Sequence, residues 1–77
     1  MEYESNDFYL SCCLLASGIP LKKLKKENSK FFTFVFDNSQ QKVDRIIQDH
    51  WNRNLNLPTR TLIDSIHELK TRLHSGV

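Results

Sequence analysis

The densest apolar stretch of the chain lies at residues 31–36, which read Phe-Phe-Thr-Phe-Val-Phe. Aromatic and β-branched side chains at this density predict a strand, because their bulk fits a pleated surface better than a helical turn. Alternation along a strand places Phe32, Phe34 and Phe36 on one face and the odd-numbered residues on the other. We expect the even-numbered face to line the core and the opposite face to need a cover.

A second apolar run spans residues 8–17 and is bounded at both ends by helix signals. Residues 5–7 (Ser-Asn-Asp) offer side-chain oxygens that cap a helix, and Gly18 followed by Pro20 is typical of a helix end. The run therefore predicts a helix of about three turns. A buried strand is the alternative, since periodicity does not separate the two in so short a run.

Residues 19–26 combine Leu21 and Leu24 with a series of lysines. This composition is typical of an edge strand, whose charge discourages pairing with another chain. Residues 27–29 (Glu-Asn-Ser) favour a turn. Residues 20–37 thus predict a β-hairpin whose second arm is the aromatic strand.

Two helices are expected after the hairpin. Asn38 or Ser39 is placed to cap the first of them, and Gln40 and Gln41 would then lie in its first turn. Helical spacing gives this segment a buried stripe of Val43, Ile46, Ile47 and Trp51, with His50 beside it. Residues 55–57 alternate in polarity and predict either a brief third strand or a plug for the core.

The last helix is expected to begin at Pro58 and Thr59 and to end at Gly76, because proline suits the first helical turn and glycine the position after the end. Its buried stripe is Leu62, Ile66, Leu69 and Leu73, widened by Ile63. The chain therefore predicts one α+β domain over residues 1–77, with an ordered core at about 6–74 and the order α-β-β-α-α. A two- or three-stranded antiparallel sheet packs against three helices, and the first helix or a second copy covers its outward face.

Five short segments combine packing and capping residues: 7–10 (Asp-Phe-Tyr-Leu), 15–19 (Leu-Ala-Ser-Gly-Ile), 34–36 (Phe-Val-Phe) with the acid that follows, 51–52 (Trp-Asn) and 68–73 (Glu-Leu-Lys-Thr-Arg-Leu). Together they resemble an uncharacterised family of small domains from prokaryotic, phage and mobile-element proteins. The resemblance covers nearly the whole chain and implies a shared fold and a prokaryotic or viral setting. It implies no activity and no catalytic residue.

The net charge of +2 is small, but positive charge is concentrated beside the aromatic strand. Five lysines fall within nine residues: Lys22, Lys23, Lys25, Lys26 and Lys30. Such a row predicts a surface for nucleic-acid phosphates, where each contact adds salt-dependent affinity. The alternative is an edge strand kept soluble by its charge. On the last helix, one flank carries further positive or titratable residues beside Ile63: Arg60, His67, Lys70 and His74.

Residues 30–36 also look like the strand motif of RNA-recognition domains, in which a basic residue precedes alternating aromatics that stack on bases. The matching residues are Lys30, Phe32, Phe34 and Val35. Phe36 comes one position early, and Phe31 and Thr33 replace the small residues of the motif. We therefore expect the aromatic side chains to form a core rather than a base-stacking platform.

Catalytic and metal-binding chemistry is not expected. His50, His67 and His74 lack a close spacing of zinc ligands. The adjacent Cys12 and Cys13 lie in an apolar segment, where thiols act as small buried hydrophobes in a reducing compartment. A cysteine nucleophile also needs a base, which the sequence does not place. Neither of the two glycines belongs to a phosphate-binding loop, so no cofactor and no enzyme activity are expected.

The remaining signals concern setting and partners. The acidic first residues and the lack of a long apolar run predict neither a secretory signal nor a membrane span, so a cytoplasmic protein is expected. Trp51 is either an interface anchor or a core residue, and its place in an apolar stripe favours the core. We expect a non-enzymatic binding module whose leading ligand is nucleic acid. The alternative is a protein–protein adaptor or inhibitor that acts through a sheet edge or an exposed aromatic face, or as a homodimer.

Overall fold

The computed structural model describes residues 1–27 and 31–75, which form a three-stranded antiparallel sheet and three helices. The strands are β1 (Glu2–Ser5), β2 (Leu21–Lys26) and β3 (Phe32–Asp37), and the helices are α1 (Phe8–Ala16), α2 (Val43–Trp51) and α3 (Thr59–Ser75). The α+β fold and the predicted element order are confirmed, with β1 added before α1. The predictions for Lys30, for a turn at residues 28–29 and for a helix end at Gly76 lie outside the described residues.

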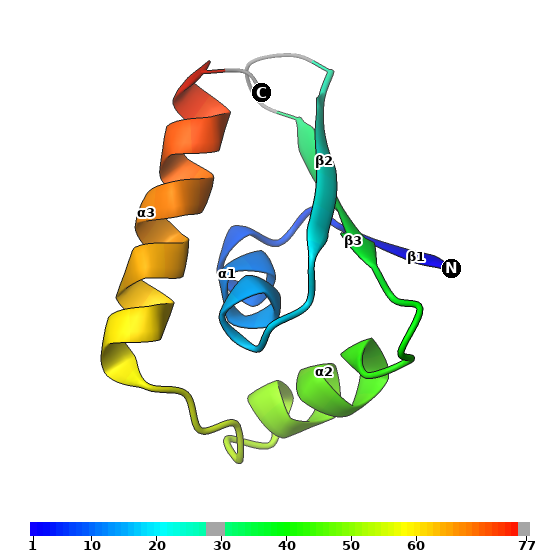
Figure 1. Cartoon of the computed structure of the whole chain (residues 1–77), viewed down its shortest axis with the longest axis vertical. Helices are drawn as coiled ribbons and strands as arrows, with labels where there is room; N and C mark the ends of the chain where they lie inside the picture. Colours follow the sequence, from blue (N-terminus) through cyan, green and yellow to red (C-terminus); the bar gives the residue numbers. More distant parts are fainter. Residues whose placement is uncertain (28–30, 76–77) are drawn as a thin grey trace.

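β3 is the central strand, with β1 on one side and β2 on the other (Figure 1). The predicted hairpin of β2 and β3 and the edge position of the lysine-rich strand are confirmed. The third strand is β1, so the strand, one of the two alternatives predicted for residues 55–57, does not form. Both sides of β3 are already occupied, and residues 55–57 belong to the loop that links α2 to α3.

The helices lie on one side of the sheet, where they form the core with β3 (Figure 1). The core cluster includes Leu10, Cys12 and Leu14 of α1, Phe34 and Phe36 of β3, Val43 of α2 and Leu69 of α3. The prediction that the even-numbered face of β3 lines the core is confirmed. Residues 10–14 of α1 are all buried, so this helix is apolar on every side and must be enclosed. The prediction that it covers the outward sheet face is therefore wrong.

No helix within residues 1–27 and 31–75 lies on the outward face of the sheet, yet Val35 at its centre is 0% exposed. Glu4 of β1 and Lys23 of β2 lie opposite Val35 in the two ladders and share its face. Long charged side chains bury apolar surface beneath their methylene groups while their charged ends stay in water. The neighbouring strands thus supply the cover within one chain, which does not require a second copy.

Both ends of α1 carry the capping residues that the sequence predicts. Asp7 Oδ1 accepts a hydrogen bond from the N–H of Leu10 at 3.1 Å. Gly18 has a φ of +93°, and the N–H of Ile19 donates to the carbonyl of Leu14 at 3.1 Å. This glycine-terminated helix end satisfies the last carbonyls of α1 and turns the chain into β2.

α2 begins later than predicted. Asn38 Oδ1 accepts a hydrogen bond from the N–H of Val43 at 3.3 Å, so Asn38 does serve the helix start. Gln40 and Gln41 lie in the turn before α2 and not in its first turn. Gln41 has a φ of +56°, a left-handed conformation that a right-handed helix cannot continue through.

Candidate functional site

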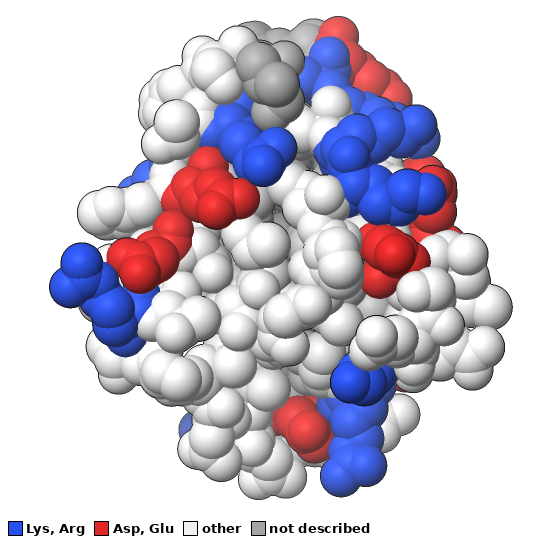
Figure 2. All heavy atoms as spheres, in the orientation of Figure 1, with Lys and Arg blue, Asp and Glu red and all other residues white. Residues whose placement is uncertain are grey.

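The lysines predicted to bind phosphate lie on two faces of β2. Lys23 and Lys25 pair with odd-numbered residues of β3 and therefore lie on the outward face, whereas Lys26 lies on the helical side. A bulge at Lys22 places this residue between the two registers. Figure 2 shows positive side chains gathered over β2 with acidic side chains directly beside them. Lys30 lies outside the described residues.

Two ion pairs join β2 to β1 across the outward face of β3. Lys22 Nζ lies 2.8 Å from Glu2 Oε2, and Lys25 Nζ lies 3.1 Å from Glu4 Oε2. The hydrogen bond and charge of Lys22 lower the pKa of Glu2, and Glu2 in turn raises the pKa of Lys22. The Lys22–Glu2 pair is therefore charged at neutral pH. The two ion pairs connect the two edge strands, which have no ladder contact with each other.

Lys26 makes a different contact, on the helical side. Its Nζ donates a hydrogen bond to the carbonyl of Leu73 at 2.8 Å. Leu73 lies near the end of α3, where main-chain carbonyls lack helical partners and favour a cation. Lys26 thus connects the end of β2 to the end of α3.

The outward face as a whole is close to neutral. In the described part of the chain its charged residues are Lys22, Lys23 and Lys25 against Glu2, Glu4 and Asp37, three of each sign. Asp37 Oδ1 accepts a hydrogen bond from the N–H of Ser39 at 2.9 Å, which lowers the pKa of Asp37 and keeps it charged. Lys23 makes no ion pair within residues 1–27 and 31–75. A phosphate on this face would meet carboxylates as closely as amines.

The predicted positive flank of α3 also carries mixed charge. Arg60 Nε lies 3.2 Å from Asp64 Oδ1, and on the same helix Arg72 Nε lies 3.4 Å from Glu68 Oε2. In each exposed pair the two partners lie one helical turn apart on α3. These acids interrupt the positive residues, so α3 does not extend the lysine surface with a continuous positive stripe.

Trp51 is 65% exposed, and the prediction that it is a core residue is wrong. The reason is angular: at about 100° per residue, Trp51 lies about 80° around α2 from the fully buried Val43, whereas His50 lies about 20° from it. His50 therefore occupies the inward position and is half-buried. The same argument applies on α3, where Ile63 was predicted to widen the buried stripe and is 43% exposed.

Contacts between α1 and α2 hold Trp51 in place. The Trp51 ring packs edge-on against the His50 ring, with 4.8 Å between ring centroids, and His50 Nδ1 lies 3.8 Å from Cys13 Sγ. Tyr9 precedes Cys13 by one turn, shares its face of α1 and is 65% exposed. We call His50 and Trp51 the aromatic surface.

The cysteines are free and buried, as predicted. Burial raises the pKa of Cys12 to about 11, and burial together with the charge of Asp7 raises the pKa of Cys13. Both thiols are therefore protonated at neutral pH. The sequence could not place a base near them, and the fold places His50 beside Cys13 from a position 37 residues later.

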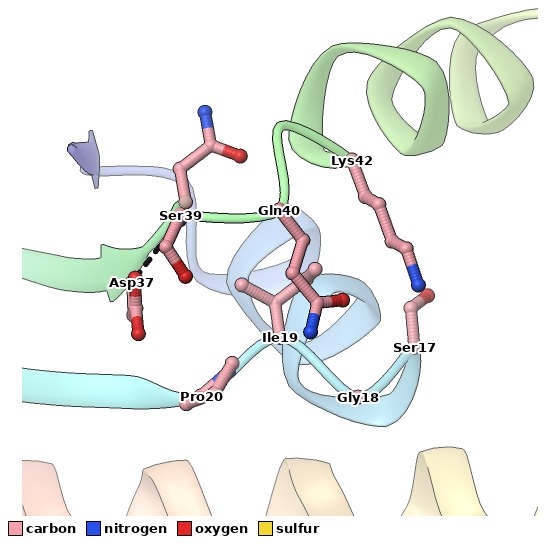
Figure 3. Close-up of a pocket in the computed structure, with 9 residues that line it drawn as sticks. Ser17, Gly18, Ile19, Pro20, Asp37, Ser39, Gln40 and Lys42 are labelled. Atoms are coloured by element: carbon pink, nitrogen blue, oxygen red, sulfur yellow. Dashed lines mark hydrogen bonds between the residues drawn. The ribbon is translucent and has the colours of Figure 1, made fainter.

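A small polar hollow of about 120 Å³ lies between the α1–β2 turn and the β3–α2 loop. Figure 3 shows Lys42 and Gln40 reaching from the loop toward Ser17 and Ile19 in the turn. Asp37 lines the opposite end, so the hollow carries both signs of charge. Lys22, Lys23, Lys25 and Lys26, on which the nucleic-acid prediction rests, do not line it.

Within the described ranges, no cluster of three or more possible metal ligands occurs and no helix is long and apolar enough to cross a membrane. Neither a curated protein nor a solved structure matches the chain. One protein family does match, over residues 1–75, and it is described as Domain of unknown function (DUF5659). The match spans β1 to α3, and the chain therefore belongs to this family.

Proposed function

We propose that the protein is a non-enzymatic binding module that takes a protein partner on its aromatic surface. The exposure of Trp51 is the observation that carries this proposal, because tryptophan and tyrosine dominate the energetics of protein interfaces. The contacts of Trp51 with His50, and of His50 with Cys13, hold the ring before a partner arrives. Pre-ordered aromatic side chains lose little entropy on binding.

The charge distribution supports a protein partner over nucleic acid. Lys22, Lys25 and Lys26 already have partners within the chain, and the outward face has no excess of positive charge. Phosphate binding depends on such an excess, since counterion release drives it. The proposed setting is the cytoplasm of a prokaryote or of a phage-infected cell, supported by the family resemblance of the sequence and by two cysteines that form no disulfide with each other.

The proposal is tested by affinity capture from lysates of the source cells, with Trp51→Ala as the decisive variant. We expect proteins that the wild type retains to be lost with Trp51→Ala, because truncating an anchor of this kind weakens binding by about 30-fold or more. Ile63→Ala is the matched control, since it removes another exposed apolar side chain. Light scattering on the purified chain shows whether a second copy is the partner. Equal capture by wild type and Trp51→Ala contradicts the proposal.

Nucleic acid is the second candidate ligand, and Lys23 is the observation that favours it. This residue lies on the outward face of the sheet without an ion pair in the described part of the chain. The candidate predicts binding to DNA or RNA that falls steeply from low to moderate salt. It also predicts that binding weakens when four lysines become glutamine: Lys22, Lys23, Lys25 and Lys26. Salt-insensitive binding, or none, rejects this candidate.

A further inference from the structure

The contact between Cys13 and His50 has a chemistry that the proposed function does not use. Cys13 Sγ and His50 Nδ1 lie 3.8 Å apart at the junction of α1 and α2. A thiol and an imidazole nitrogen are two of the strongest metal ligands among protein side chains, and both belong to helices packed in the core. Their separation is set by the fold, since the two residues are 37 positions apart in the chain.

The distance between the two atoms suits a shared metal ion. Typical metal bonds of about 2.3 Å to sulfur and about 2.0 Å to imidazole nitrogen, closed over 3.8 Å, give an angle of about 124° at the metal. This angle is close to that of a trigonal site. Two ligands of a trigonal site are then present, and the third position is left for a small ligand from solution.

We propose that Cys13 and His50 form a site for a soft monovalent cation of the copper(I) class. A thiolate with an imidazole selects soft ions over magnesium or calcium, which prefer oxygen. The nearby carboxylate of Asp7, whose charge acts on the thiol, also favours a bound cation. On binding, the S–H proton leaves to the buffer and an S–metal bond replaces it, while the neutral imidazole donates its lone pair without a proton change.

The fluorescence of Trp51 can report on the site. The Trp51 ring packs against the His50 ring, so a metal bound to Nδ1 of His50 is separated from the indole only by the imidazole. Silver(I) serves as the probe because it has the charge and softness of copper(I) without its redox chemistry. We expect titration of the folded chain with silver nitrate to change Trp51 fluorescence and to shift the ring nitrogen resonances of His50 at one equivalent.

Variants separate the two-ligand site from binding by a single thiol. The titrations use a Cys12→Ala background, in which Cys13 is the one remaining cysteine. We expect Cys13→Ser to abolish the response. His50→Gln should raise the Kd for silver by about tenfold or more, a loss seen even when residues that only support a ligand are removed.

A change in Kd of less than tenfold for His50→Gln overturns the proposal, because the thiol alone would then account for binding. Unmoved His50 resonances in the Cys12→Ala chain overturn it as well, and this measurement needs no change at the site itself. Circular dichroism confirms that each variant is folded before titration. The result is independent of the protein partner, since the Trp51→Ala capture experiment leaves both metal ligands in place.

Discussion

The two faces of β3 are sealed in different ways. On the inner face, Phe34 and Phe36 are fully buried under the apolar faces of three helices. On the outer face, Val35 is equally buried, but charged side chains of β1 and β2 surround it. Burial alone therefore does not identify a core. A row of lysines beside an aromatic strand can cover the sheet and pair with the acids of a neighbouring strand. The exposed rings of Tyr9 and Trp51 belong to the helices and not to the outward face of the sheet.

The largest expected effect is on the free energy of unfolding, which truncations on the two faces of β3 should lower by different amounts. Phe34→Ala should lower the free energy of unfolding by about 3–5 kcal/mol, because it opens a cavity among rigid apolar neighbours. Val35→Ala removes fewer atoms beneath flexible side chains that can collapse, and it should cost about 1–2 kcal/mol. Urea unfolding of both variants measures the difference. Equal losses would mean that the outer face is packed as rigidly as the inner one.

The next prediction concerns the acids of β1, which we expect to neutralise the lysines on the outward face of the sheet. Glu2→Gln with Glu4→Gln removes the partners of Lys22 and Lys25. We expect this double variant to bind single-stranded DNA about tenfold more tightly than the wild type at low salt, because two lysines become available to phosphates. Asp64→Asn with Glu68→Gln is the matched control, since it removes the same charge from α3. An equal gain in DNA affinity in the control would show that the net charge of the chain sets this affinity, and not the ion pairs on the outward face.

The smallest effect is a pH dependence of stability at the edge of the sheet. The pKa of Glu2 is lowered in the folded chain, so its contribution is present above its ordinary value near 4.5 and is lost as pH falls through the lowered folded pKa. Glu2→Gln should therefore be less stable than the wild type near neutral pH and equal to it in strong acid. Thermal unfolding across this pH range shows whether the two curves converge. Parallel curves would mean that the Lys22 ion pair contributes nothing.

Local signals in the sequence were sufficient for much of the fold. The capping by Asp7, the helix end at Gly18 and the alternation of β3 each depend on residues close together in the chain. β1 escaped prediction because Tyr3 is the one apolar residue among its four positions. Its strand character comes from pairing with β3, whose partner residues lie 29 to 35 positions later in the chain.

The aromatic surface and the ion pairs of the lysines were harder to predict, because they too depend on contacts between residues distant in the sequence. Trp51 was assigned to the core from spacing alone, whereas a small rotation about α2 puts His50 inward instead. The pairing of Cys13 with His50, and of Lys25 with Glu4, depends on how elements pack across the fold. No local pattern records such contacts, so the lysines looked available and the tryptophan looked buried.

We propose that a protein partner binds the aromatic surface and leaves the lysines on the outward face of the sheet unoccupied. The most direct test is chemical-shift mapping of the labelled chain with a partner recovered by affinity capture. We expect the resonances of His50 and Trp51 to move, while the side-chain resonances of Lys22 and Lys25 stay in place. Shifts confined to the lysines of β2, with an unchanged Trp51 indole, would contradict the account.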